Sequence, residues 1–100
     1  MPPSPYRIDY SGDVNEQFRR LIAQARDEGR EEEMRAEARR LFADLLADPF
    51  EVGEARNNYP AIGIRERFAV YGPLVAYFGV HEASRVVIIS RFRLLKARRG

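Results

Sequence analysis

The stretch from Leu74 to Arg93, LVAYFGVHEASRVVIISRFR, decides the fold. Two apolar runs, Leu74–Val80 and Arg85–Phe92, have the composition of strands, and the polar segment His81–Ser84 between them predicts a turn. Within the second run, Val86–Ile89 supply apolar side chains to both faces of a strand. We therefore expect this strand to lie inside a sheet and not at its edge.

The residues before this hairpin predict one more strand and a loop. Ile62, Ile64 and Phe68 fall in a strand that ends at the turn Gly72-Pro73. Residues 49–60 are rich in proline, glycine and asparagine and show no periodicity, so they predict a loop. The three strands then form a meander.

The N-terminal half predicts a short strand and two helices. Apolar and polar residues alternate from Pro5 to Tyr10, which is typical of a half-buried strand. Asp13 and Glu16 have the spacing of a capping box, and an apolar stripe predicts a first helix over 14–28. A second stripe predicts another helix, which begins with three glutamates after Gly29 and ends at Asp48-Pro49.

Together these elements predict an α+β fold in the order β-α-α-β-β-β. A helix hairpin would cover one face of an antiparallel-rich four-stranded sheet, in which the first strand lies beside the last. The 100 residues suffice for a single domain, which we place at residues 5–95. Residues 1–4 would form a flexible N-terminus and residues 96–100 a basic tail.

Composition excludes several classes of protein. Cysteine is absent and His81 is the only histidine, so disulfides, thiolate chemistry and a multi-histidine metal site are excluded. No apolar run has the length of a membrane span, and the N-terminal residues do not have the pattern of a secretory signal. We therefore expect a cytoplasmic protein with no metal and no membrane partner.

The positive charge is concentrated at one end of the chain. Residues 83–100 contain six basic residues and no acid, whereas residues 1–82 contain 11 basic and 15 acidic residues. Such an end suits an anionic partner such as nucleic acid, although a solubilising tail would have the same composition.

Four arginines on two predicted strands are candidates for phosphate binding. Arg65 and Arg67 share a strand face, and so do Arg91 and Arg93, because side chains alternate along a strand. If the two faces coincide, the four guanidinium groups would line one groove, with Lys96 close by. The alternative is a set of exposed arginines paired with acids such as Glu66 or Glu82.

Candidates for proton transfer are few. His81 lies in the predicted turn, where an exposed histidine without a function is the alternative interpretation. Tyr71 and Tyr77 carry hydroxyls, but Tyr77 lies in an apolar strand and favours a core position. Glu66 is adjacent to both Arg65 and Arg67 and so points to the opposite face.

The order of elements and several short motifs resemble the RelE/ParE superfamily of bacterial type II toxins. The motifs are a first strand ending near Ser11, the Leu-rich helix end before Asp48-Pro49, and Gly53. Arg65, then the segment Tyr77–Val80, and then a Val/Ile-rich strand leading to basic residues complete the similarity, which covers residues 5–95.

This resemblance implies a toxin that is neutralised by a cognate antitoxin and acts either on the ribosome and its messenger RNA or on DNA gyrase. For the first target it implies a metal-independent endoribonuclease with no cofactor, whose site would contain Arg65, Arg91, Arg93, Tyr71 and His81. No Tyr or His follows the last predicted strand. A non-toxic interaction domain of the same fold and a general nucleic-acid-binding module therefore also remain open.

Overall fold

The computed structural model describes residues 6–96, which form two α-helices and a five-stranded mixed sheet. The predicted N-terminus, residues 1–4, and all of the predicted basic tail 96–100 except Lys96 lie outside the described residues. The elements follow in the order β1 (Arg7–Tyr10), α1 (Gly12–Asp27), α2 (Glu31–Ala47), β2 (Glu54–Tyr59), β3 (Ile64–Tyr71), β4 (Leu74–His81) and β5 (Val86–Leu94). Two short 3-10 turns, η1 (Pro49–Glu51) and η2 (Pro60–Ile62), flank β2. The α+β class is therefore confirmed.

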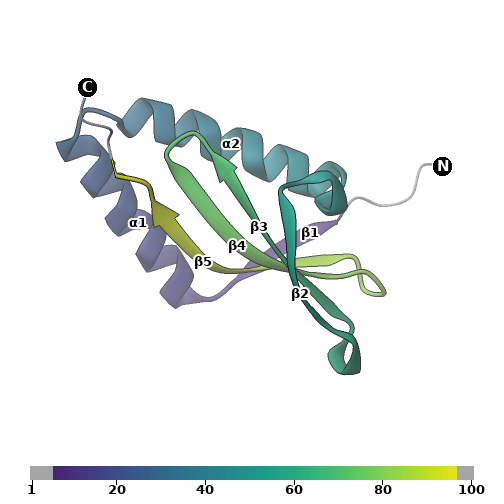
Figure 1. Cartoon of the computed structure of the whole chain (residues 1–100). Coiled ribbons are helices and arrows are strands. Elements are labelled where there is room, and N and C mark those ends of the chain that lie inside the picture. Colours follow the sequence, from purple (N-terminus) through teal and green to yellow (C-terminus); the bar gives the residue numbers. More distant parts are fainter. Residues whose placement is uncertain (1–5, 97–100) are drawn as a thin grey trace.

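Both helices form where the apolar stripes predicted them. The start of α1 differs from the prediction, because Ser11 and not Asp13 is the N-cap, and its hydroxyl accepts a hydrogen bond from the Val14 N–H at 3.3 Å. Between the helices Gly29 adopts φ +71°, which ends α1 and allows α2 to turn back. Figure 1 shows both helices on the same side of the sheet.

The sheet has the order β1-β5-β4-β3-β2, with antiparallel pairs from β2 to β5. β1 pairs in parallel with β5, from Arg7 opposite Val86 to Tyr10 opposite Ile89. The prediction that the first strand lies beside the last, and that the last is internal, is confirmed. β5 extends beyond the end of β1. There the Phe92 N–H donates to the Gln17 side-chain oxygen at 2.7 Å, so a residue of α1 takes the place of a partner strand.

The fifth strand, β2, is where the four-strand prediction is wrong, because it lies within the predicted loop 49–60. Every side chain of β2 is exposed, so the strand has no apolar alternation to reveal it. A bulge at Arg56 further disturbs the period, since Ala55 pairs with Arg67 and Asn57 with the adjacent Glu66. Backbone pairing with β3 at the sheet edge holds β2 in place.

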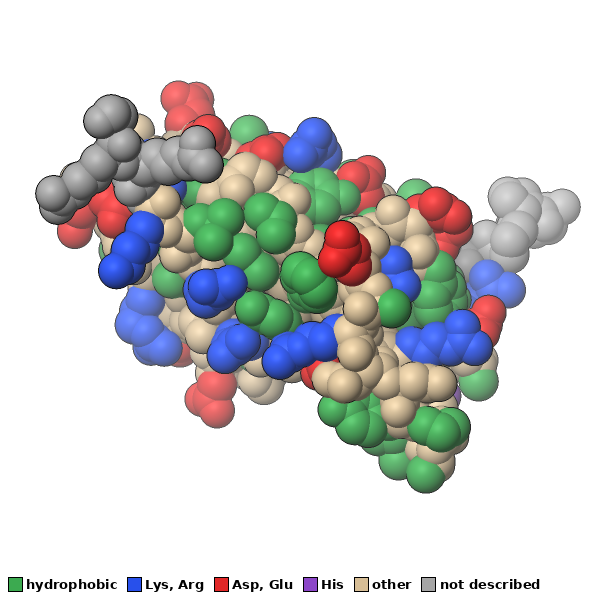
Figure 2. Space-filling view, in the orientation of Figure 1, with side chains coloured by type: hydrophobic (Ala, Val, Ile, Leu, Met, Phe, Trp, Pro, Cys, Tyr) green, Lys and Arg blue, Asp and Glu red, His purple; other side chains and the backbone are tan. Residues whose placement is uncertain are grey.

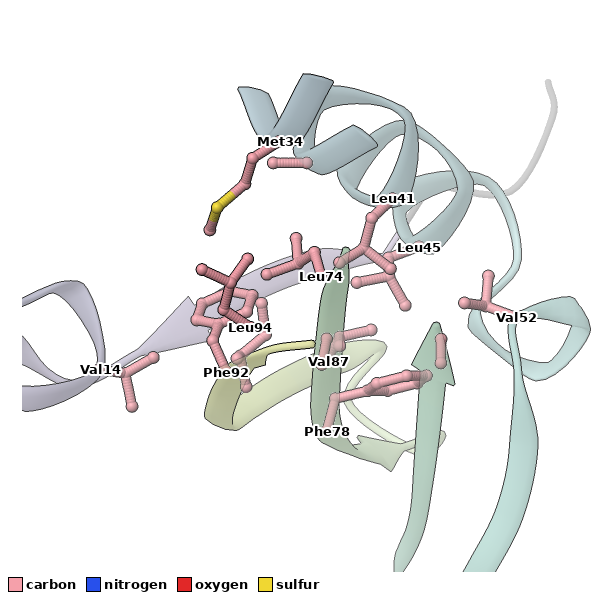
Figure 3. Close-up of a cluster of buried hydrophobic side chains, with 14 of the residues drawn as sticks. Val14, Met34, Leu41, Leu45, Val52, Leu74, Phe78, Val87, Phe92 and Leu94 are labelled. Atoms are coloured by element: carbon pink, nitrogen blue, oxygen red, sulfur yellow. The ribbon is translucent and has the colours of Figure 1, made fainter. Parts of the chain in front are cut away.

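The core lies between the helices and the covered face of the sheet. Met34, Leu41 and Leu45 of α2 are fully buried and point toward the sheet, where Phe78 of β4 and Val87 of β5 are also buried (Figure 3). On the side of α1, the rings of Phe18 and Phe92 pack with centroids 5.0 Å apart. This packing covers one face of the sheet and leaves the other, which we call the open face, without a helix.

Candidate nucleic-acid interface

The register of the sheet determines which side chains reach the open face. Phe78 and Val80 of β4 point into the core, so Val75 and Tyr77 point to the open face. On the neighbouring strand β5, Arg91 is paired with Tyr77 and Arg93 with Val75. The two arginines therefore lie on the open face, and both are exposed.

Arg91 and Arg93 lie on the open face because β5 contains a bulge. Ile89 pairs with Phe78 and Arg91 with the adjacent Tyr77, so Ser90 is the extra residue, and its hydroxyl donates to the Tyr77 carbonyl at 3.1 Å. Without an extra residue, Arg91 would share the core face with Ile89. The bulge reverses which side chains of β5 point to each face beyond Ser90. Phe92 therefore lies in the core, and Arg91 and Arg93 lie on the open face.

Three guanidinium groups surround one tyrosine on this face. The guanidinium carbons of Arg91 and Arg56 lie 4.3 Å and 5.0 Å from the centroid of the Tyr77 ring, which are cation-π distances. The ring also stacks on Phe68 of β3, with centroids 6.2 Å apart. Arg56, Tyr77, Arg91 and Arg93 form what we call the arginine–tyrosine cluster. Figure 2 shows Lys and Arg side chains in a row across the middle of the face in view, beside hydrophobic ones.

The cluster changes the acidity of the phenol. Desolvation acts to raise the pKa of the Tyr77 hydroxyl, but hydrogen bonding to Arg93 and Arg91 and their positive charges outweigh it. The net result is a pKa below the ordinary value for tyrosine. The arrangement therefore favours the phenolate form more than an isolated tyrosine would.

One carboxylate, Glu66 of β3, lies beside the cluster. Its side chain accepts a hydrogen bond from the Asn57 amide at 2.7 Å and lies 3.8 Å from the Arg56 Nε. Among the described residues, none of the ion pairs within 4.0 Å involves Arg91 or Arg93. Their charge is thus available to an anion that approaches the open face.

The single groove predicted from four arginines is wrong. Arg65 pairs with Val80 and Arg67 with Phe78, so both lie on the covered face, opposite to Arg91 and Arg93. Arg67 donates to the carbonyls of Val52 and Gly53, each at 3.1 Å, and thereby holds the segment that directly precedes β2. Arg65 lies over the Phe50 ring, 5.6 Å from its centroid.

Tyr71 is also separated from the cluster, because it lies on the covered face next to α2. Its hydroxyl donates to the Asp44 carboxylate at 2.6 Å, and the Arg40 guanidinium lies 4.8 Å from its ring centroid. Partial burial, followed by the hydrogen bond and the negative charge of Asp44, raises the pKa of Tyr71 to about 12. These contacts are structural, and they do not bring Tyr71 to the arginines of β5.

We expect Tyr71→Phe to lower the free energy of unfolding by about 1 kcal/mol at pH 8, because it removes a partly exposed charge-assisted hydrogen bond. The raised pKa means that this contribution is complete below pH 10 and is lost as the pH rises to about 12. Urea unfolding of both proteins from pH 8 to 12 measures it. Coincident stability curves for the two proteins would show that the Asp44 contact contributes nothing.

The two remaining candidates, His81 and Lys96, lie away from the cluster. His81 ends β4 and is not inside the turn as predicted, and its Nδ1 lies 2.6 Å from the Ser84 hydroxyl. It shares the open face with Tyr77, but the four-residue separation along the strand is about 13 Å. Lys96 is exposed just beyond β5.

Two residues of the cluster were missed as site residues in the sequence analysis. Arg56 lay in the predicted loop, and Tyr77 was interpreted as a core residue. The polar Ser90 between apolar Ile89 and Phe92 is the one signal in the sequence that is consistent with a bulge. Within residues 6–96, no group of three or more His, Asp or Glu side chains is arranged to hold a metal ion.

No protein-family model matches the sequence, and no curated protein and no solved structure shows significant similarity to it. The RelE/ParE resemblance therefore stays a prediction. In the described part of the chain, neither helix has the length and apolarity that crossing a bilayer requires.

Proposed function

We propose that the chain is a RelE/ParE-like toxin of a bacterial type II toxin-antitoxin module and that it acts on RNA in the cytoplasm. The fold is in keeping with this proposal, since a helix hairpin follows the first strand and that strand lies beside the last. The observation that carries the proposal is the arginine–tyrosine cluster on the face that no helix covers.

The chemistry of the cluster fits the RNA backbone. Guanidinium groups bind phosphate oxygens through paired N–H donors, and their planes can stack on bases that are not in a duplex. The guanidinium groups of Arg91 and Arg56 lie over the Tyr77 ring, so this contact positions them before a ligand arrives. Single-stranded RNA therefore fits this face better than a duplex, whose bases are already paired and stacked.

A toxin of this kind needs a neutralising partner. We propose that the cognate antitoxin covers the open face with an acidic segment, because carboxylates would pair with Arg91 and Arg93 and thereby exclude phosphates. The same complementarity predicts that RNA and the antitoxin compete for the protein.

Controlled expression of the chain alone in a bacterial host, with pulse-labelling of new protein and new DNA, tests the function. We expect protein synthesis to fall first, and the double substitution Arg91→Ala/Arg93→Ala to abolish the fall. The matched control is Arg20→Ala/Arg39→Ala, which removes two exposed helix arginines and should leave the arrest intact.

Other outcomes would contradict the proposal. An earlier fall in DNA synthesis would identify gyrase as the target. Undisturbed synthesis of both polymers would show that the chain is not a toxin. Salt-sensitive binding to any nucleic acid, without arrest, would leave a general nucleic-acid-binding module.

A further inference from the structure

We propose that a cavity on the covered face, between η1 and the β2–β3 hairpin, binds a free mononucleotide. The cavity has a volume of about 370 Å³, which lies in the range of sites for small ligands. We call it the Phe50–Arg65 pocket, and the side chains that face it are Phe50, Ala55, Asn58, Arg65 and Arg67. The proposal does not depend on the proposed function, because the arginine–tyrosine cluster lies on the opposite face of the sheet.

The pocket lies where the sheet extends further than the helices do. The β2–β3 hairpin projects beyond both helices (Figure 1), so neither helix lies over this end of the covered face. Asn58 is directly opposite Arg65 in this hairpin, and Ala55 is directly opposite Arg67. Because opposite residues of an antiparallel pair share a face, the four side chains lie together on one side.

The pocket carries positive charge that no carboxylate neutralises. Among the described residues, neither Arg65 nor Arg67 takes part in an ion pair within 4.0 Å. Arg67 donates to two backbone carbonyls, which leaves its charge in place and further N–H groups as donors. Glu66 also lines the pocket, but its carboxylate accepts a hydrogen bond from Asn57 on the open face. Glu82 lines a smaller cavity beside Arg65 and does not pair with it within 4.0 Å. The expected ligand is therefore an anion.

An aromatic ring and an amide in the same pocket favour a ligand with a planar polar ring. The Arg65 guanidinium carbon lies 5.6 Å from the centroid of the Phe50 ring, which is a cation-π distance. The Phe50 ring packs against the core and makes an edge contact with Tyr6, with centroids 6.5 Å apart, so its position is fixed. Asn58 is exposed next to Arg65 and carries a donor and an acceptor on one amide.

A nucleotide combines the groups that these side chains bind. Its phosphate would accept hydrogen bonds from Arg65 and Arg67, because guanidinium groups bind phosphate through paired N–H donors. Its base would pack against the Phe50 ring and the guanidinium of Arg65, and the Asn58 amide would bond to the edge of the base. Inorganic phosphate offers only the first set of contacts and a nucleoside only the second. A mononucleotide should therefore bind more tightly than either.

A free nucleotide fits the pocket better than one that belongs to an RNA strand on the open face. Arg56 of the cluster and Arg65 of the pocket lie on opposite faces of the sheet. A strand that occupies both would have to bend around the sheet edge formed by β2. Binding to the pocket and binding to the cluster should therefore be independent.

Nuclear magnetic resonance titration of the isotope-labelled full chain tests the proposal. The ligands are adenosine 5′-monophosphate (AMP), adenosine, inorganic phosphate and a 2′-O-methyl oligoribonucleotide. The variants are Arg65→Ala, which removes an exposed charge, and Arg65→Lys, which keeps the charge but loses the paired donors and the plane. Arg20→Ala, which removes an exposed arginine of α1, is the matched control, and thermal unfolding checks that all the proteins are folded.

We expect AMP to shift the backbone amide signals of Ala55 and Asn58 and the side-chain amide signals of Asn58, and to leave the Tyr77 amide unchanged. Arg65→Ala should weaken the binding of AMP at least about tenfold, because it removes hydrogen bonds to a charged group. Arg65→Lys should lose nearly as much affinity. Arg20→Ala should bind AMP as the unmodified protein does.

Several results would overturn the proposal. They are the absence of shifts at about 10 mM AMP, equal affinity for AMP and inorganic phosphate, and full affinity in Arg65→Lys, which would show that only a positive charge is needed. Shifts of the Tyr77 amide in place of those in the pocket would show that AMP binds the cluster. Pocket shifts with the oligoribonucleotide but not with AMP would show that the ligand is an RNA strand.

Discussion

Simultaneous replacement of Arg91 and Arg93 by alanine is expected to weaken the binding of single-stranded RNA at least 100-fold. Each charge-assisted hydrogen bond contributes about 1.5 to 3 kcal/mol, and about 1.4 kcal/mol corresponds to a tenfold change in affinity. Both guanidinium groups lie on the open face, and no carboxylate of the described residues neutralises them. The double substitution should therefore remove the attraction for phosphate without leaving a buried carboxylate unpaired.

The salt dependence gives a second readout of the same change. Each phosphate contact to a single strand contributes about 0.7 to the slope of log K against log salt, so the double variant should have a slope shallower by about 1.4. Fluorescence anisotropy with a 2′-O-methyl oligoribonucleotide from 50 to 300 mM salt measures both quantities.

Two further variants locate the effect on one face. Arg20→Ala/Arg39→Ala makes the same change in net charge on the helices and should leave the affinity within about twofold, because long-range attraction is screened at these salt concentrations. Arg65→Ala removes an arginine of the covered face, so we expect a much smaller loss than for Arg91 and Arg93. The same loss for both double variants, with about half that loss in binding free energy for Arg65→Ala, would show that binding depends on net charge and not on the arginine–tyrosine cluster.

Gly53→Ala is expected to destabilise the fold by about 3 to 5 kcal/mol, because two separate costs arise at one residue. Gly53 has φ +66°, a left-handed conformation that strains other residues. A Cβ at this position would also lie 1.9 Å from the Phe68 carbonyl oxygen and 2.9 Å from the Ala69 Cα. Both are backbone atoms of β3, so no side-chain rotation can relieve the contact.

Thermal unfolding measures this change, and the melting temperature should fall by at least about 12 °C. Gly12→Ala is the matched control, since Gly12 has no heavy atom within 4 Å of an added Cβ and lies in α1. We expect that variant to be as stable as the unmodified protein or slightly more stable. A melting temperature for Gly53→Ala within a few degrees of the control would show that β2 moves away from β3 at little cost.

The parts of the fold that sequence patterns revealed are those that bury apolar side chains. The stripes of α1 and α2 and the apolar runs of β4 and β5 all contribute to the core, so their periodicity was visible. β2 contributes no buried side chain and is held by backbone hydrogen bonds, which any sequence can form. Its residues therefore looked like a loop.

The candidate site was harder to predict because it depends on two bulges. Alternation along β5 correctly placed Arg91 and Arg93 on one face, but the extra Ser90 determines which face this is. The bulge at Arg56 likewise turns that side chain toward Tyr77. A shift of one residue exchanges the two faces of a strand, and neither shift alters the composition of the sequence.

The parallel pairing of β1 with β5 affects how the chain folds while it is being synthesised. Among the described elements, β1 is synthesised first and β5, the one strand that it pairs with, is synthesised last. Until β5 has emerged from the ribosome, β1 has no partner strand and β4 lacks a neighbour on one side, so the sheet cannot be completed before then. The arginine–tyrosine cluster combines residues of β2, β4 and β5, so a chain that lacks β5 cannot form it.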